Sequence, residues 1–274
     1  MSRIYKCAQL PFVGQKRFFI RDFSEVLGKL KNDVDTVVDL FGGSGLLSHT
    51  AKAVLPDARV VYNDFDGYSR RIAAIPSTNR ILGEIRPLLK DIPSNKRIPT
   101  ETKERILDIV ARYGSEGFVD YQTVSRSLLF SGKWAKSLAD LCKHSFYNGI
   151  RQSNYDADGY LDGLEVVYMD YRELFVRHRD NNRALFILDP PYLSTDCGMY
   201  EGWWKLADYL DVLKLLPGVR YIYFTSEKSQ LVELCDWLGK NRFECSPMEG
   251  AEIRTRNNAI NYHASFKDIM VIRA

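Results

Sequence analysis

Short apolar runs alternate with amphipathic stretches at both ends of the chain, and the two patterns predict different elements. Runs rich in β-branched and aromatic residues predict strands at 36–40, 59–63, 164–169, 184–188 and 219–225. Helical spacing of apolar residues predicts helices at 46–54, 171–177, 203–216 and 230–241, and a C-terminal β-hairpin ends in a strand at 268–273. Because strands alternate with helices, we predict an α/β fold with a parallel sheet covered on both faces.

The middle of the chain follows a different pattern. Four prolines punctuate it from residue 76 to residue 99, and no strong strand pattern is present. Helical spacing is found at 101–112, 125–130 and 135–144. We therefore predict an inserted, mainly helical domain at 76–160, and a second domain made of 1–75 and 161–274.

The composition is that of an ordinary globular protein, with 274 residues, 45% hydrophobic, 27% charged and a net charge of +3. These values exclude disordered and collagen-like classes as starting hypotheses. No apolar run approaches the roughly 20 residues of a membrane helix, and the N-terminus lacks the apolar core of a signal peptide. We therefore expect a cytoplasmic protein without membrane contact. The five cysteines form no CxxC pair, which predicts reduced thiols and no metal site.

A glycine loop follows the first predicted strand, near the carboxylate of Asp39, and precedes a predicted helix. Glycines let the backbone turn tightly and approach a ligand without a Cβ clash, so the loop suits a nucleotide-like cofactor. The spacing is not GxGxxG and no Walker lysine is present, so a pyrophosphate site is not indicated. A plain strand-to-helix turn is the alternative interpretation. The loop consists of Phe41, Gly42, Gly43, Ser44 and Gly45.

Two further carboxylates, Asp64 and Asp170, also follow predicted strands. Open α/β sheets bind ligands at the carboxyl ends of their strands, where an acid after the second strand accepts hydrogen bonds from ribose hydroxyls. Taken singly, each aspartate is as well explained by a turn or a helix cap. Together with Asp39, however, they place three carboxylates at three strand ends, which favours a ligand site.

The most specific motif is Asp189-Pro190-Pro191-Tyr192, directly after the apolar run at 184–188. From average composition, this tetrapeptide should occur by chance in about one in a thousand chains of this length. Two successive prolines give a rigid loop that presents carbonyl acceptors, one carboxylate and one aromatic face. Such a loop suits a flat ring with an exocyclic amine, which donates to Asp189 while Tyr192 stacks on the ring.

Two segments have the composition of nucleic-acid contacts. The segment 121–155 interleaves five basic residues with aromatic residues and has one acidic residue, so it can pair with phosphates and stack on bases. The alternative is a small helical domain whose aromatic residues form its core. In the segment 253–261, Arg254 and Arg256 either contact DNA phosphates or lie in a solvated hairpin.

These motifs, in this order, resemble those of the Dam-type adenine-N6 DNA methyltransferases, whose signature includes DPPY after a strand and an FxGxG loop near the N-terminus. The resemblance covers most of the chain. It implies a Rossmann-like S-adenosylmethionine-dependent methyltransferase with a mixed sheet, in which the helical insert is the target-recognition domain. The segment 10–19 is similar to the opening motif of this family.

The resemblance also implies roles for individual residues. The glycine loop would hold the methionine end of S-adenosylmethionine, Asp64 its ribose and Asp170 its adenine. The full implied cofactor set is Phe12, Val13, Lys16, Asp39, Phe41, Gly42, Gly43, Gly45, Asp64, Asp170 and Asp189. The segment 147–149 resembles a short YNG stretch on the DNA side of the family, and the candidate DNA contacts are Lys133, Tyr147, Asn148, Arg151, Arg254 and Arg256.

The reaction implied is methyl transfer to an adenine flipped out of DNA, most simply double-stranded DNA, with no metal. Asp189 and the Pro190 carbonyl would accept from the adenine amine, Pro191 would keep the loop rigid, and Tyr192 would stack on the base. The first alternative keeps the fold and changes the acceptor to cytosine-N4 or to adenine in RNA. The second is a nucleic-acid-binding protein without turnover. The recognised base sequence and a partnering restriction endonuclease are not implied by any motif.

Overall fold

The computed structural model describes residues 3–130, 132–191, 204–241, 248–261 and 264–274. The chain divides into two compact units. The sheet unit comprises Met1–Cys7, Gln15–Asp66 and Leu161–Ala274, and the helical unit comprises Ala8–Gly14 and Gly67–Tyr160.

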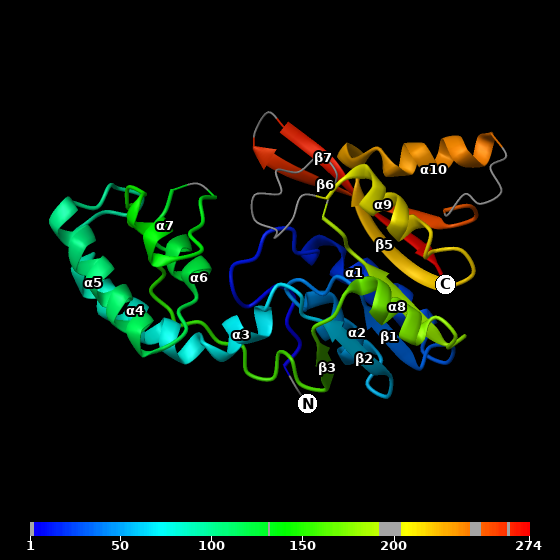
Figure 1. The fold of residues 1–274 in the computed structure, drawn as a ribbon, viewed down its shortest axis with the longest axis horizontal. Coiled ribbons are helices and arrows are strands. Elements are labelled where there is room, and N and C mark those ends of the chain that lie inside the picture. The colour runs from blue at the N-terminus through cyan, green and yellow to red at the C-terminus, as the bar shows by residue number, and fades with distance from the viewer. Residues whose placement is uncertain (1–2, 131, 192–203, 242–247, 262–263) are drawn as a thin grey trace. The chain divides into compact units, whose positions relative to one another are not determined.

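The sheet unit contains a mixed sheet, which has seven strands in the described part of the chain, in the order β3-β2-β1-β4-β5-β7-β6 (Figure 1). The first five strands in the chain are parallel, and β7 runs antiparallel to β5 and β6. The strands are β1 (Thr36–Asp39), β2 (Arg59–Asn63), β3 (Leu164–Val167), β4 (Ala184–Leu188), β5 (Arg220–Ser226), β6 (Glu252–Asn261) and β7 (Ala264–Arg273). The predicted α/β mixed sheet is therefore confirmed.

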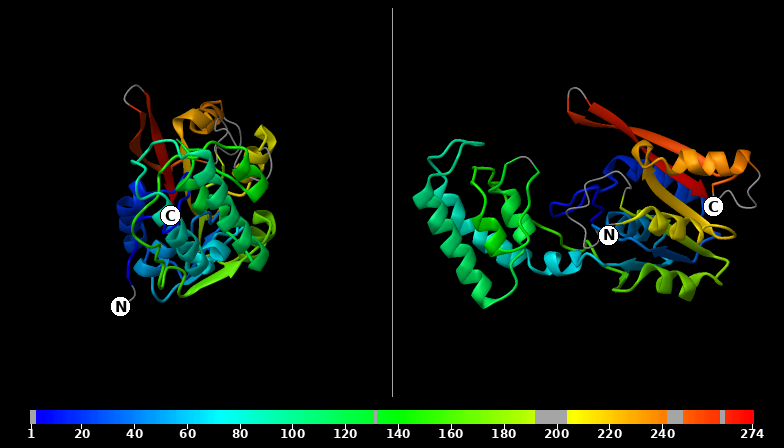
Figure 2. Two further views of the ribbon diagram at one scale, coloured as in Figure 1. Left: turned by 90° about the vertical axis from the view of Figure 1, so that its left-hand side faces the viewer. Right: turned by 45° about the horizontal axis from the view of Figure 1, so that its top comes forward.

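Helices cover both faces of this sheet, because strand side chains alternate between two apolar layers. In β4, Leu185 and Ile187 face one layer with α1 and α2, whereas Phe186 and Leu188 face the other layer with α8, α9 and α10. The helices of this unit are α1 (Ile20–Lys29), α2 (Leu46–Val54), α8 (Tyr171–His178), α9 (Leu206–Leu213) and α10 (Leu231–Lys240), with short 3-10 helices η1 (Arg17–Phe19) and η2 (Glu227–Ser229). Figure 2 shows β6 and β7 as a long hairpin.

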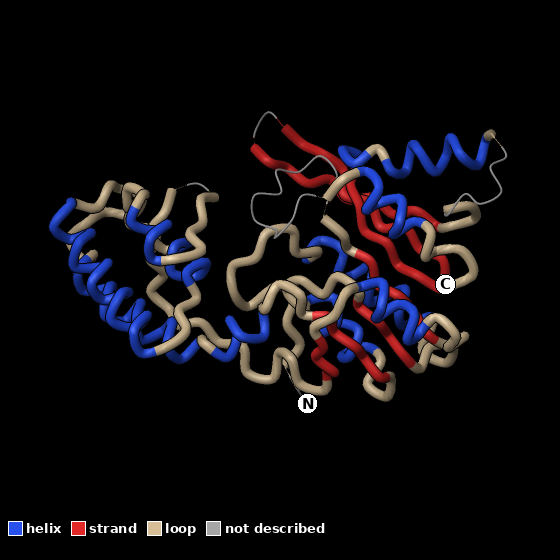
Figure 3. The backbone as a smooth tube through the Cα atoms, in the orientation of Figure 1, coloured by secondary structure: helices blue, strands red, loops and turns tan. Residues whose placement is uncertain are grey.

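The helical unit has an apolar core of its own, built from α4 to α7 and the loops between them. Figure 3 shows this part as helices and loops. Its helices are α3 (Tyr68–Ala73), α4 (Ile75–Leu88), α5 (Thr100–Glu116), α6 (Tyr121–Arg126) and α7 (Leu138–Cys142). The sequence did not predict α4, because Pro76 and Pro87 read as helix breakers. Pro76 lies in the first turn, where the missing N–H is not needed, and Pro87 lies next to the last residue of the helix.

The boundaries of the helical unit differ from the predicted range of 76–160. The unit begins at Gly67 and also includes Ala8–Gly14, which the sequence placed with the sheet. The reason is that two α3 side chains, Tyr68 and Arg71, hydrogen-bond to the backbone of Leu10 and Pro11. In the described residues, the helices are too short or too polar to span a bilayer.

Candidate active site

The carboxyl ends of the four neighbouring strands β3, β2, β1 and β4 meet at one edge of the sheet unit. Asp39 is the last residue of β1, Asp64 follows β2, and Asp189 follows β4. Asp170, three residues after β3, is the N-cap that precedes α8. The parallel registers bring these strand ends side by side, so the three-layer fold gathers carboxylates that are far apart in sequence.

Gly42 is the tightest point of the glycine loop between β1 and α2. A Cβ at this position would lie 2.2 Å from the Tyr62 ring and 2.7 Å from the Asn63 carbonyl oxygen. The next glycines, Gly43 and Gly45, have left-handed φ angles of 49° and 70°, which other residues adopt only with strain. The loop therefore packs closely on the end of β2 and requires glycine at these positions.

Asp39 is completely buried beneath this loop. Ser48 Oγ donates a 2.6 Å hydrogen bond to Asp39 Oδ2, whereas Oδ1 is buried with no hydrogen-bond partner in the described part of the chain. Burial raises the pKa of Asp39 to about 7, and the nearby charge of Asp189 adds to this, whereas Ser48, the Phe41 N–H and Lys16 oppose it. An orphaned buried acceptor is costly unless a ligand satisfies it, so Oδ1 marks a place for a donor.

Asp64 is buried and is held against the glycine loop by Tyr62. The Tyr62 hydroxyl lies 2.9 Å from Asp64 Oδ1 and 2.8 Å from the Gly43 carbonyl oxygen. The Asp64 N–H donates to the Val167 carbonyl at 2.8 Å, which ties β2 to the end of β3. The carboxylate therefore has a fixed position at the strand edge.

Sequence reasoning missed Asn63, which joins three strand ends. Its buried amide nitrogen donates to the carbonyls of Leu40 and Met169, each at 3.0 Å, and its Oδ1 accepts from the Met169 N–H at 3.0 Å. The detectable signal was a polar residue at the end of an otherwise apolar strand. Asn63 therefore positions the loops that carry the candidate ligand residues.

Lys16 and Asp189 form an ion pair across 173 residues of sequence. Lys16 Nζ lies 2.6 Å from Asp189 Oδ2, with the lysine side chain 6% exposed and the aspartate 18% exposed. Burial raises the pKa of Asp189, Asp268 raises it further, and the positive charge of Lys16 partly offsets both effects. Pro190 is buried and Pro191 is half-buried, whereas Tyr192 lies outside the described residues.

Aromatic rings line the other side of the glycine loop. Phe41 packs on Tyr171 with ring centroids 4.9 Å apart and meets the edge of Trp204 at 5.6 Å. The sequence singled out Phe41 only, because Tyr171 and Trp204 lie in separate helical stretches with no motif. Trp204 directly follows the segment 192–203, which lies outside the described residues.

Asp170 is the N-cap of α8, the alternative that the sequence left open for strand-end aspartates. Its side chain accepts from the Arg172 N–H at 2.7 Å, and it is 46% exposed. A cap oxygen stabilises the first turn of a helix. The other carboxylate oxygen lies 3.6 Å from Arg172 Nη1, and the predicted contact with cofactor adenine stays a prediction.

Comparison with known proteins decides the family. No protein-family model matches the sequence. A protein of Haemophilus influenzae described as "Putative methyltransferase" is 39% identical over 251 residues, which cover 88% of this chain and 83% of that protein. The chain belongs to this methyltransferase family. A solved structure of precorrin-6y C5,15-methyltransferase from Geobacter metallireducens covers 99% of the chain at 10% identity with a TM-score of 0.37.

In this methyltransferase, the predicted cofactor residues Phe12 and Val13 belong to the helical unit. The ring of Phe12 meets the edge of the Tyr68 ring at 5.7 Å, and Val13 is exposed. These two predicted cofactor residues therefore belong to a different unit from Lys16, Asp39 and the glycine loop.

The candidate DNA contacts in the helical unit divide into exposed and buried groups. Lys133 and Arg151 are exposed, and Tyr147 is half-buried beside Phe130 with ring centroids 5.3 Å apart. Asn148 is buried, and its amide nitrogen donates to the Ile92 carbonyl at 2.6 Å. Asn148 therefore has a structural role within the unit, because its donor is already used there.

The candidate DNA contacts in the hairpin are bound to acidic side chains. Arg256 makes two hydrogen bonds of 2.6 and 2.7 Å to the carboxylate of Asp22 in α1. Arg254 pairs with Glu252 at 2.6 Å and with Glu25 at 3.3 Å. The pairs with Asp22 and Glu25 attach β6 to α1, so phosphate contact by either arginine stays a prediction that competes with a structural role.

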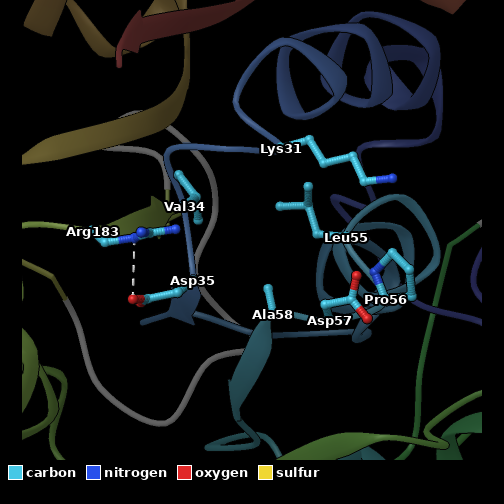
Figure 4. Close-up of a pocket in the computed structure, with 8 residues that line it drawn as sticks. All are labelled: Lys31, Val34, Asp35, Leu55, Pro56, Asp57, Ala58 and Arg183. Carbon is cyan, nitrogen blue, oxygen red and sulfur yellow. Dashed lines mark ion pairs between the residues drawn. The ribbon is translucent and has the colours of Figure 1, made fainter.

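A pocket of about 140 Å³ lies at the opposite, amino edge of the sheet (Figure 4). Val34, Leu55 and Ala58 are among its lining residues, and Arg183 pairs with Asp35 beside it at 3.3 Å. It precedes β1, β2 and β4 rather than following them, so it is remote from the carboxylates described above. In the described residues no group of side chains has the composition of a metal site.

Proposed function

We propose that this methyltransferase transfers a methyl group from S-adenosylmethionine to the N6 amine of adenine in DNA. The observation that carries the proposal is Asp189 of the Asp-Pro-Pro segment, partly exposed at the carboxyl end of β4 and held by Lys16. It lies in the same sheet edge as the glycine loop and the orphaned acceptor of Asp39. A carboxylate with one oxygen bound and one available suits an amine donor.

The residues of the sheet edge fit the cofactor. S-adenosylmethionine carries an activated methyl group on a sulfonium, together with an ammonium and ribose hydroxyls. Asp39 Oδ1 offers a buried acceptor to a donor of this kind, and the glycine loop, which packs closely on Tyr62 and Asn63, begins two residues after Asp39 in the chain. Asp64, fixed by Tyr62, is placed at the strand end where acids accept from ribose hydroxyls.

Asp189 polarises the attacking amine. The lone pair of an adenine amine is delocalised into the ring, so it becomes nucleophilic when its hydrogens are bound by acceptors. Asp189 Oδ1 and the Pro190 carbonyl supply such acceptors, because Lys16 takes Oδ2. The nitrogen then bonds to the methyl carbon as the carbon–sulfur bond breaks, and the carboxylate receives the amine proton. The raised pKa of Asp189 suits it to receive that proton.

The acceptor class rests on the tetrapeptide and on the helical unit. An Asp at the first position favours adenine in the resembling family, and a base in a duplex must be flipped to reach such a loop. In the helical unit, Lys133 is exposed and can reach phosphates, whereas the exposed Arg151 is bound to the Ser153 hydroxyl at 2.7 Å and lies over the Tyr155 ring. Double-stranded DNA is therefore the proposed partner, with the cytoplasm as its place of action.

The test is methylation with isotopically labelled S-adenosylmethionine, using methylation-free genomic DNA and total RNA, followed by nucleoside mass spectrometry. Wild type and an Asp180→Asn control should produce labelled N6-methyladenine in DNA, since Asp180 is 98% exposed. An Asp189→Ala variant should produce none. Label in N4-methylcytosine, or label found only in RNA, would show that the methyl group goes to a different acceptor from the one proposed. Cofactor binding without any label would refute the proposal.

A further inference from the structure

An exposed loop of the helical unit, residues 151–155, is fixed by the side chain of Arg86 in α4. The loop has no regular secondary structure, and four of its five residues are exposed. Arg86 Nε and Nη2 donate to the carbonyls of Arg151 and Ser153 at 3.1 and 3.2 Å, and Nη1 donates to Asn154 Oδ1 at 3.0 Å. Because a guanidinium is planar and rigid, these three bonds hold the loop in one orientation against α4.

Asn79, seven residues before Arg86 in α4, fixes the end of the same loop. Its amide nitrogen donates to the Tyr155 carbonyl at 2.9 Å, and its Oδ1 accepts from the Tyr155 N–H at 2.8 Å. An exposed segment that buries little apolar surface is usually poorly ordered. Here the 151–155 loop is ordered by polar bonds to one helix.

These bonds use the acceptors of the loop and leave its donors. Of the five backbone carbonyls in the loop, three accept from Arg86 or Asn79. Of its five N–H groups, only that of Tyr155 donates within the described part of the chain. Four consecutive N–H groups, at 151–154, therefore belong to exposed residues and stay available to a ligand that accepts hydrogen bonds.

A positive charge is held at the same loop. Arg151 Nε and Nη2 donate to Ser153 Oγ at 3.2 and 2.7 Å, and the guanidinium lies over the Tyr155 ring, 4.1 Å from its centroid. Among the described residues, neither Arg151 nor Arg86 forms an ion pair with a carboxylate. Free N–H groups together with guanidinium charge are the groups that bind phosphate oxygens in protein–DNA interfaces.

We infer that the 151–155 loop is a preformed site for a phosphate of the nucleic-acid backbone, with Arg86 and Asn79 as its positioning residues. Since the loop is already ordered, binding costs less conformational entropy than binding to a mobile loop would. The inference rests on the proposed function for the assignment of the phosphate to DNA. Phosphate contacts carry no base sequence, so the loop would fix the position of the helical unit on DNA without selecting the target.

The first test is amide hydrogen exchange at residues 151–154 of the whole protein, followed by mass spectrometry. The probes are a short DNA duplex, the same duplex with neutral methylphosphonates in its backbone, and inorganic phosphate. Exchange should slow by about threefold or more with the unmodified duplex and not with the methylphosphonate duplex. Unchanged exchange at saturating DNA, or equal protection by both duplexes, would overturn the inference. Protection by inorganic phosphate but not by DNA would overturn its assignment to nucleic acid.

The second test separates the order of the loop from its charge. Arg86→Lys keeps the charge but loses the planar fork, so residues 151–154 should exchange faster in the free protein. DNA affinity should fall about three- to tenfold with an unchanged slope of log affinity against log salt. Arg151→Gln removes a charge at an exposed position and should lower that slope by about 1. The control is Arg105→Lys, at an exposed position of α5, which should change neither.

The outcomes for the loop and for the proposed function are distinguishable. Wild-type affinity and salt slope in both loop variants, in a protein that methylates adenine in DNA, would refute the inference alone. Loss of affinity in the loop variants of a protein that places no label on adenine would uphold the inference and refute the proposed function alone.

Discussion

Ser48 donates to one oxygen of Asp39 and leaves the other buried without a partner in the described residues, so the carboxylate is half-satisfied. This arrangement is unfavourable for an ionised group in the free protein. The pKa of Asp39 is raised to about 7, chiefly because burial disfavours the ionised carboxylate. The site is thus prepared for a donor at a measurable cost to the stability of the free protein.

We predict that this cost depends on pH. Asp39 binds its proton more tightly in the folded state than in the unfolded state, so its contribution to folding is most favourable at low pH and is lost as pH rises toward 7. Relative to Asp39→Asn, the wild type should lose up to about 1.4 kcal/mol of unfolding free energy per pH unit between roughly pH 4 and 7. Urea unfolding of both proteins across this range measures the difference. Parallel profiles would contradict the assignment.

Substitution of Gly42 should disturb the glycine loop and, with it, the proposed cofactor site. The added Cβ of Gly42→Ala would overlap the Tyr62 ring and the Asn63 carbonyl, so the loop must shift. We expect a loss of about 1–3 kcal/mol in stability and at least about a tenfold weaker affinity for S-adenosylmethionine by calorimetry. Gly28→Ala is the control, because a Cβ there meets nothing within 4 Å and the residue lies in a helix. An unchanged affinity in Gly42→Ala would exclude the loop from the cofactor site.

Loss of Lys16 should move the acid limb of the pH–rate profile. Without the ammonium, burial raises the pKa of Asp189 further, and in the proposed reaction Asp189 must be ionised to accept from the amine. Lys16→Met should therefore lose activity at higher pH than wild type does and reduce the single-turnover rate by about 10- to 100-fold. Lys16→Arg keeps the charge and should restore the wild-type limb in part. Identical acid limbs in wild type and Lys16→Met would show that Lys16 does not influence the ionisation of the group that limits the rate.

The salt dependence of DNA binding should distinguish the arginines of the hairpin from the basic residues of the helical unit. Arg256→Gln removes a paired side chain and should cost about 1 kcal/mol of stability without changing the salt dependence of DNA binding. Lys133→Gln should instead lower the slope of log affinity against log salt by about 1. Fluorescence anisotropy at several salt concentrations measures both. A lower slope for Arg256→Gln would support the phosphate contact predicted from sequence.

The sequence by itself determined the elements and the motifs of the sheet edge. The strands at 59–63 and 184–188 and the helix at 46–54 were predicted with their observed bounds. These elements could be predicted because β-branched runs, helical spacing and proline determine the backbone conformation of the residues next to them. The need for glycine at position 42 could be predicted for the same reason. The sequence did not predict that the Tyr62 ring is what excludes a side chain there.

Only the tertiary structure decided which of these groups meet. Lys16 reaches Asp189 across 173 residues of sequence, and no local pattern encodes that contact. The same holds for the attachment of residues 8–14 to α3 and for the pairing of Arg256 with Asp22. Local sequence sets backbone preferences over a few residues, whereas the partner of a charged side chain is set by packing of the whole chain. The role proposed for Asp189 therefore comes from its motif, and its electrostatic environment comes from the fold.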